Sequence, residues 1–247
     1  MEPLRPVLYF IHGGGLIAGS NRSSMRAVLD IAQESGLAVV SAEYRLAPEH
    51  PYPAAVDDCF AGLEWTAAHA AEVGTDPGRV LLCGASAGGG LAPAVALLAR
   101  DRKGLAVAAQ MLICPMLDHR NDTPSSHQMA SQPFWNRQAN DTGWTAYLPG
   151  RDHGEDISPY ASPTSAGDLS GVPPAYLDVG TVDTFRDEVI AYPDGLWRAG
   201  GDAELHVWSG GYHGFEQLLP QSALAHEART ARVNWLRRQL TSATQST

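Results

Sequence analysis

The sequence predicts an α/β fold with a mostly parallel central sheet and helices on both of its faces. Short apolar runs alternate along the chain with longer segments of helical periodicity. Most of these runs are apolar on both faces, as expected for strands that are covered from two sides. The length of 247 residues suits a single domain of this class, and we expect residues 1–247 to form one.

Six apolar runs account for the sheet. They are residues 7–11, 37–41, 80–83, 106–113, 175–179 and 204–208. A parallel pair of strands needs a long crossover, which is usually a helix. Four segments of helical character lie between or after the strands, at residues 25–34, 54–72, 87–102 and 223–240.

Residues 117–174 interrupt this alternation. The segment is rich in Ser, Asp, Asn and Pro and carries two aromatic pairs, Phe134 with Trp135 and Trp144 with Tyr147. A connection of this length without a strand is typical of a rim or lid over a functional site. We therefore predict an irregular excursion over the site, in which the aromatic side chains either line a substrate pocket or pack in the core.

The charge balance and the cysteines exclude several classes of function. The chain has 17 Lys and Arg against 27 Asp and Glu, a net charge of −10, which disfavours binding to nucleic acid or to an anionic membrane. No apolar run reaches the roughly 18 residues of a membrane span, and no signal peptide is visible, so we expect a cytoplasmic protein. Cys59, Cys83 and Cys114 are odd in number and lie in apolar surroundings, which predicts reduced core thiols and no metal site.

Gly84-Ala85-Ser86-Ala87-Gly88 follows a predicted strand and opens a predicted helix. A sharp turn from strand to helix needs small residues around its apex, because the chain doubles back without room for a Cβ. Ser86 is then held at the carboxyl edge of the sheet, above a helix N-terminus. The pattern is common by chance, but its strand–turn–helix setting predicts a nucleophilic serine.

His12-Gly13-Gly14-Gly15 lies at the end of the first predicted strand. Consecutive glycines let backbone N–H groups point into a cavity without side-chain obstruction, as an oxyanion hole requires. A plain glycine-rich turn is the alternative for this segment alone. The serine turn elsewhere in the chain favours the oxyanion hole.

A serine nucleophile needs a base, and the base needs an acid that orients it. Asp183 and His213 follow the last two predicted strands, in the chain order Ser, Asp, His that this kind of fold uses. Asp187 and Glu188 are further acidic candidates, but their positions are typical of charge at the start of a helix. The remaining histidines lack the spacing of a metal site.

These residues resemble the hormone-sensitive-lipase-like family of α/β-hydrolases, also called the bacterial family IV esterases. The resemblance covers nearly the whole chain, and its most specific part is the run Tyr-Arg-Leu-Ala-Pro-Glu-His-Pro-Tyr-Pro-Ala-Ala at residues 44–55. It implies Ser86 as nucleophile, Asp183 as acid and His213 as base, with the backbone N–H groups of Gly13, Gly14 and Ala87 as the oxyanion hole.

The chain departs from the family pattern in ways that affect the site. Ala85 stands where the family usually has Asp, and Leu16 starts a run where an aromatic is common. The family also has a long segment with two strands and a cap before the first glycine motif, where this chain has about ten residues. We therefore expect a reduced or absent N-terminal cap, an open site, and an exposed sheet edge at residues 37–41 that a second copy of the chain could cover.

The sequence thus predicts a serine carboxylesterase that hydrolyses short-chain, acetyl-like esters through an acyl-enzyme without metal or cofactor. Its partner is a small-molecule ester, and activity should fall as His213 protonates, near pH 6.5 in an ordinary environment. Alternatives with the same residues are a deacetylase, an amidase, a lactonase, or a catalytically degenerate hydrolase that binds a small molecule. Candidate substrate contacts are Leu16, Phe134, Trp135, Trp144, Tyr147 and Tyr212.

Overall fold

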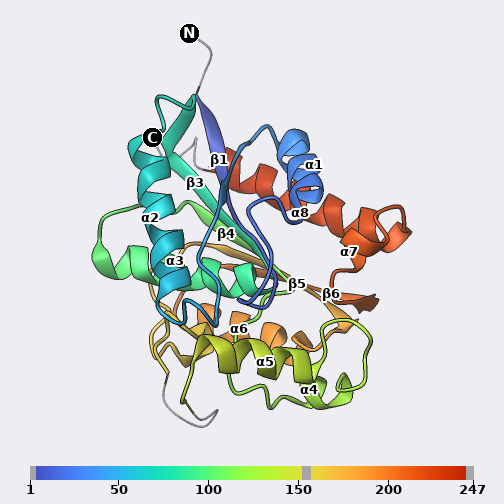
Figure 1. Cartoon of the computed structure of the whole chain (residues 1–247). Coiled ribbons are helices and arrows are strands. Elements are labelled where there is room, and N and C mark those ends of the chain that lie inside the picture. Colours follow the sequence, from blue (N-terminus) through green and yellow to red (C-terminus); the bar gives the residue numbers. More distant parts are fainter. Residues whose placement is uncertain (1–3, 152–156, 243–247) are drawn as a thin grey trace.

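A single sheet of six strands organises the chain (Figure 1). The computed structural model describes residues 4–151 and 157–242. All neighbouring strands are parallel, in the order β2-β1-β3-β4-β5-β6, so the predicted parallel sheet is confirmed. The strands are β1 (Arg5–Ile11), β2 (Ala38–Ala42), β3 (Thr75–Ala85), β4 (Ala109–Ile113), β5 (Ala175–Val182) and β6 (Ala203–Tyr212).

Helices cover both faces of this sheet, as predicted. Figure 1 shows α1 and α8, which pack on each other, on one face, and α2 and α3 on the other. The helices are α1 (Met25–Ser35), α2 (Ala54–Ala68), α3 (Ala87–Arg102), α4 (Pro124–Gln128), α5 (Arg137–Tyr147), α6 (Arg186–Arg198), α7 (Phe215–Leu218) and α8 (Ala223–Ser242), with a 3-10 turn at Pro163–Ser165.

Strand β2 forms one edge of the described sheet and pairs only with β1. Its side chains Val39 and Val40 are partly buried, whereas every residue of β4 is buried. The edge that the sequence places at residues 37–41 is therefore present. Parallel pairing continues from β1 across to β6, which forms the other edge.

The excursion contains two helices that the sequence analysis did not predict, α4 and α5. Each begins at a capping side chain: Thr123 accepts a hydrogen bond from the backbone N–H of Ser126, and Asn136 accepts one from Ala139. Both helices lie beyond the carboxyl ends of the strands in Figure 1. Within the described part of residues 117–174, the segment has no strand, as predicted.

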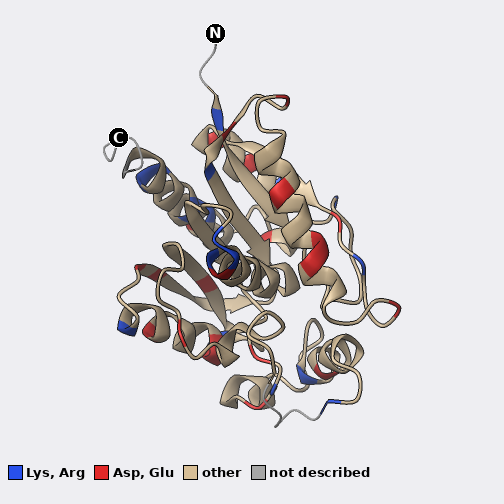
Figure 2. Cartoon of the chain, turned by 90° about the vertical axis from the view of Figure 1, so that its left-hand side faces the viewer, with Lys and Arg blue, Asp and Glu red and all other residues tan. Residues whose placement is uncertain are grey.

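Charged side chains of both signs are distributed over the described helices and loops, and the three thiols are buried. In the view of Figure 2, the described Lys and Arg residues are interspersed with Asp and Glu over the helices and loops. Cys59, Cys83 and Cys114 are free and buried, which confirms the prediction of reduced core thiols. Among the described helices, none combines the length and the apolar character needed to cross a bilayer.

A buried ion pair joins α8 to β5. The guanidinium of Arg232 donates to both carboxylate oxygens of Asp178, at 2.7 and 3.0 Å, and the Tyr176 hydroxyl donates to the same carboxylate at 3.1 Å. Both charged side chains are only 2% exposed. A buried charge whose partner is removed keeps its full desolvation cost.

We expect Arg232→Met to lower the free energy of unfolding by about 3–5 kcal/mol, because Asp178 would stay buried without its partner. Urea denaturation of the wild type and the variant measures the difference. Arg237→Met, on the exposed side of the same helix, removes a hydrogen bond to the Glu34 carbonyl and is expected to cost less than about 1 kcal/mol. Equal losses in the two variants would contradict the role given to the buried pair.

Candidate active site

Ser86 lies at the apex of the turn between β3 and α3. Its backbone angles, φ 55° and ψ −119°, fall in a region that L-residues rarely adopt. The flanking glycines are required sterically. A Cβ at Gly84 would lie 2.0 Å from the carbonyl oxygen of Gly88, and a Cβ at Gly88 would lie 2.1 Å from that of Ile11. The turn therefore depends on the two glycines that the sequence analysis singled out.

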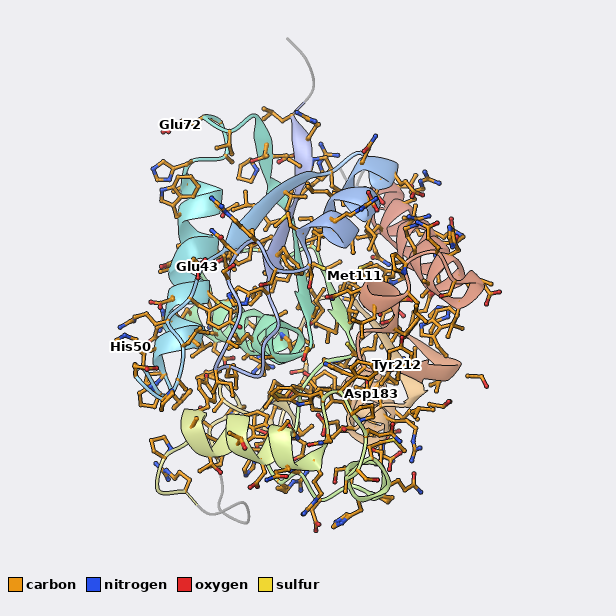
Figure 3. All side chains as sticks on the ribbon, turned by 45° about the vertical axis from the view of Figure 1, so that its right-hand side comes forward. Glu43, His50, Glu72, Met111, Asp183 and Tyr212 are labelled. Carbon is orange, nitrogen blue, oxygen red and sulfur yellow. The ribbon has the colours of Figure 1, made fainter. Side chains whose placement is uncertain are left out.

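Ser86, His213 and Asp183 are joined by hydrogen bonds. The Nε2 atom of His213 lies 3.0 Å from Ser86 Oγ, and its Nδ1 atom lies 2.9 Å from Asp183 Oδ2. The other carboxylate oxygen accepts a hydrogen bond from the backbone N–H of Phe185 at 3.0 Å, which fixes the carboxylate plane. Asp183 directly follows β5 and His213 directly follows β6. Figure 3 shows Asp183 beside Tyr212, the last residue of β6, at these strand ends.

The environment of His213 is not the ordinary one that a pKa near 6.5 assumes. Burial lowers the pKa of the imidazole, but the charge and hydrogen bond of Asp183 outweigh this effect and, with the nearby Cys114, raise the pKa well above 6.5. The ring of Phe185 packs edge-on against it, with ring centroids 5.2 Å apart. The expected loss of activity near pH 6.5 is therefore corrected to a higher pH.

Backbone N–H groups lie beside the serine. A Cβ at Gly13 would be 2.8 Å from the Ala85 carbonyl oxygen and 3.1 Å from Ser86 Cβ. The glycine loop, residues 13–15, therefore packs directly against the turn that carries Ser86. Gly14 has a φ of 124°, which favours glycine. In residues 4–151 and 157–242, no hydrogen bond from the N–H groups of Gly13, Gly14 or Ala87 is found. The backbone N–H groups of these three residues are therefore not used by the described part of the chain.

The sequence pattern of the α/β-hydrolase fold family matches residues 8–217. The chain belongs to this family. It is 36% identical over 224 residues to carboxylesterase NlhH of Mycobacterium tuberculosis, a match that covers 89% of the chain and 70% of NlhH. The acetyl-hydrolase of Streptomyces hygroscopicus is 32% identical over 228 residues, or 91% of the chain and 74% of that protein.

Solved structures agree with the sequence matches. A bacterial heroin esterase superposes with a TM-score of 0.93 at 40% identity, over 97% of the chain and 76% of the esterase. The resemblance to family IV esterases is thereby confirmed, and this α/β-hydrolase is a carboxylic ester hydrolase.

Three of the predicted substrate contacts lie around His213. The indole of Trp135 lies across Gly15, where a Cβ would be 2.0 Å from Cη2, and its ring centroid is 6.5 Å from that of His213. Phe134 is 50% exposed and stacks on Tyr212 with ring centroids 5.1 Å apart. Trp135 therefore lies near His213, and Phe134 packs on the residue that precedes His213 in the chain.

The other three predicted contacts are held in the core. Leu16, Trp144 and Tyr147 are at most 2% exposed and belong to the main hydrophobic cluster. Tyr147 packs edge-on against Tyr52, with ring centroids 5.8 Å apart. For Trp144 and Tyr147 this is the packing role that the sequence analysis left open, and Leu16, expected only as a substrate contact, is buried in the same cluster.

Asp187 and Glu188 hold the excursion onto α6. Glu188 is buried, and one oxygen of its carboxylate accepts hydrogen bonds from the backbone N–H groups of Leu117, at 2.7 Å, and Asp118, at 3.3 Å. Asp187 accepts a hydrogen bond from the N–H of Ser125 at 2.7 Å. Their positions at the start of α6 were predicted, but these ties to residues 117–125 were not.

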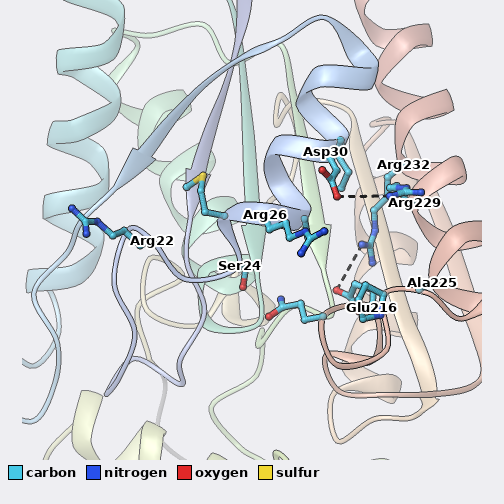
Figure 4. Close-up of a pocket in the computed structure, with 13 residues that line it drawn as sticks. Arg22, Ser24, Arg26, Asp30, Glu216, Ala225, Arg229 and Arg232 are labelled. Atoms are coloured by element: carbon cyan, nitrogen blue, oxygen red, sulfur yellow. Dashed lines mark ion pairs between the residues drawn. The ribbon is translucent and has the colours of Figure 1, made fainter.

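A cavity of about 320 Å³ lies between α1, α7 and α8, and neither Ser86, Asp183 nor His213 lines it (Figure 4). Two ion pairs border it, Arg229 with Asp30 at 3.8 Å and Arg232 with Glu216 at 3.7 Å. Helix α7 starts two residues after His213, so the cavity adjoins the loop that carries the imidazole. Its lining does not include any of the predicted substrate contacts.

Cys114 is a neighbour of the triad that sequence reasoning missed. Its Sγ, a ring nitrogen of His213 and a carboxylate oxygen of Asp183 all lie within 4.8 Å of one another. Cys114 directly follows β4, which lies between β3 and β5. That place at the carboxyl end of a central strand is the signal that could have drawn attention to it.

Proposed function

We propose that this enzyme is a serine carboxylesterase that cleaves short-chain acyl esters through an acyl-enzyme. Ser86 is the nucleophile, His213 the base and Asp183 the acid that orients it. The observation that carries the proposal is the single imidazole, with Ser86 Oγ at 3.0 Å from one ring nitrogen and Asp183 Oδ2 at 2.9 Å from the other. This connectivity is what acyl transfer by a serine requires.

The first half of the reaction acylates the serine. His213 Nε2 accepts the hydroxyl proton as Ser86 Oγ attacks the acyl carbonyl carbon, and Asp183 stabilises the imidazolium that forms. His213 then gives this proton to the oxygen of the leaving alcohol as the C–O bond breaks. In the second half, His213 takes a proton from water, whose oxygen attacks the acyl carbon of the acyl-enzyme. His213 then gives this proton to Ser86 Oγ as the bond to the acyl group breaks and the acid leaves.

The negative charge that develops on the acyl oxygen needs donors that are already in place. The backbone N–H groups of Gly13, Gly14 and Ala87 supply them in this proposal. Gly13 packs against the serine turn, and none of the three groups is committed to another described residue. One such donor is typically worth about 3–4 kcal/mol of transition-state stabilisation.

The position of the Trp135 indole supports the preference for short acyl chains. Trp135 lies between the glycine loop and His213, so it occupies space on one side of the serine. One relative, the acetyl-hydrolase of Streptomyces hygroscopicus, is named for removal of the smallest common acyl group. A bulky indole at this position would obstruct a long acyl chain.

A panel of nitrophenyl esters from C2 to C12 tests the substrate class. We expect kcat/KM to be highest for the shortest acyl chains, and we expect turnover of the matched nitroanilide to be far slower. A rate that rises steadily towards C12 would contradict the short-chain proposal. Faster cleavage of the anilide than of the ester would favour an amidase with the same triad.

We expect Trp135→Ala to shift the preference towards longer esters, because removal of the indole opens space beside Gly15 and His213. The ratio of kcat/KM for the C8 ester over the C2 ester should rise about tenfold, a size typical of a reshaped hydrophobic pocket. Trp65→Ala is the matched control, since Trp65 is 49% exposed on α2 and stacks on His69. An unchanged ratio in Trp135→Ala would remove this residue from the acyl pocket.

A further inference from the structure

The thiol of Cys114 extends the triad into a set of metal ligands. Its Sγ, a ring nitrogen of His213 and a carboxylate oxygen of Asp183 lie within 4.8 Å of one another. Thiolate, imidazole and carboxylate are the three protein ligands that Zn²⁺ takes, and none of the steps of ester hydrolysis uses the thiol. We propose that these three residues form an inhibitory site for a borderline-soft divalent cation such as Zn²⁺.

The distances between the three ligand atoms allow tetrahedral coordination of an ion after small side-chain movements. Ligand atoms at normal zinc distances stand about 3.3–3.6 Å apart. His213 Nδ1 and Asp183 Oδ2 are 2.9 Å apart, and the three ligand atoms lie within 4.8 Å of one another, so binding needs shifts of about 1 Å or less per atom. The three residues follow the adjacent strands β4, β5 and β6, whose parallel pairing holds the backbone positions. The movement therefore falls on side-chain torsions rather than on the sheet.

The charges of the ligands match those of the ion. A coordinated thiol loses its proton to solvent, so Cys114 would bind the ion as a thiolate. One thiolate and one carboxylate then neutralise a dication, which limits the cost of placing it where Cys114 is 7% and Asp183 1% exposed. The imidazole of His213 is 15% exposed and offers the route of entry.

Occupation of the site removes the base from the reaction. The ion takes a lone pair of His213 and an oxygen of Asp183, which are the groups that accept and stabilise the proton of Ser86. A triad without the thiol retains only two of these ligands and should bind the ion more weakly. Metal binding would thus be a second property of these residues, separate from their proposed role in ester hydrolysis.

Inhibition by ZnCl₂ of nitrophenyl acetate hydrolysis tests the site in wild type, Cys114→Ala and Cys114→Ser. The half-inhibiting concentration should rise at least about tenfold in both variants, since each lacks the thiolate, and a chelator should restore wild-type activity. Cys59→Ala is the matched control, because it removes another fully buried thiol, on α2, and should keep the wild-type half-inhibiting concentration. An equal half-inhibiting concentration in Cys114→Ala, or a wild type that zinc does not inhibit, would overturn the proposal.

A spectroscopic measurement tests the site without ester turnover. Co²⁺ added to wild type or Ser86→Ala should give a thiolate-to-cobalt charge-transfer band in the near ultraviolet, and Cys114→Ala and Cys114→Ser should lack it. The band is expected even if the proposed short-chain esters are poor substrates, so failure of that proposal and failure of this one are distinguishable. Absence of the band in the wild type, or its persistence in Cys114→Ala, would refute the site.

Discussion

Ser86→Ala is expected to abolish nearly all ester hydrolysis, lowering kcat for nitrophenyl acetate by a factor of about 10⁴–10⁶. The reason is specific to one atom. Ser86 Oγ is the hydroxyl that lies 3.0 Å from His213 Nε2. Without it, the acyl-enzyme cannot form, and only substrate binding and oxyanion stabilisation remain.

Steady-state kinetics and thermal unfolding of the same preparations separate lost chemistry from lost folding. Alanine meets the same strain at φ 55° as serine does, so the melting temperature should change little. Ser170→Ala, which removes an exposed hydroxyl that bonds to Asp168, should retain wild-type kcat. Turnover by Ser86→Ala close to that of the wild type would exclude the serine mechanism.

The sheet and the triad were predictable because their causes are local in the sequence. Apolar runs fix the strands, and a strand end followed by Gly84-Ala85-Ser86-Ala87-Gly88 leaves few conformations, since a Cβ at either glycine meets backbone about 2 Å away. In a parallel sheet, strand ends share one edge, so Asp183 and His213 could be placed near Ser86 without coordinates.

Other features depend on neighbours that the sequence does not pair. The thiol of Cys114 is one of three buried thiols, and only the strand order places it beside His213. Arg232 lies on a helix of mixed polarity, and its burial against Asp178 follows from the packing of α8 on the sheet. The hydrogen bonds from the backbone of Leu117 and Ser125 to Glu188 and Asp187 also join distant parts of the chain and have no local signature.

Asp183→Asn is expected to lower kcat by a factor of about 10⁴, because an amide at this position no longer holds the productive tautomer of His213 or stabilises its cation. The residual activity should also have a different pH dependence. In the wild type, burial lowers the pKa of His213, but the opposing effect of Asp183 is larger and, with that of Cys114, brings the pKa well above 6.5. Since the base works only when neutral, wild-type activity should be lost on acidification at a pH above 6.5.

Removal of the carboxylate charge leaves burial as the main effect on His213, so the acid limb of kcat/KM should move to lower pH in Asp183→Asn. The free energy of unfolding should also differ between the wild type and Asp183→Asn, and this difference should depend on pH. A folded-state pKa raised by Asp183 stabilises the wild type fully below pH 6.5, and this contribution disappears as pH rises through the folded pKa. Asp183→Asn should therefore lose more unfolding free energy at acidic than at alkaline pH.

Asp187→Asn tests whether the shift of the acid limb is specific to Asp183 or follows the loss of any nearby acidic side chain. Asp187 bonds to Ser125 and Arg186, so its replacement should disturb the excursion but leave the acid limb where the wild type has it. If Asp187→Asn shifted the limb and Asp183→Asn did not, the orienting acid would be Asp187. If neither variant shifted the acid limb of kcat/KM, the group whose protonation causes that limb would not be His213. A carboxylate 2.9 Å from the imidazole must alter the pKa of His213, so its removal has to move a limb that His213 causes.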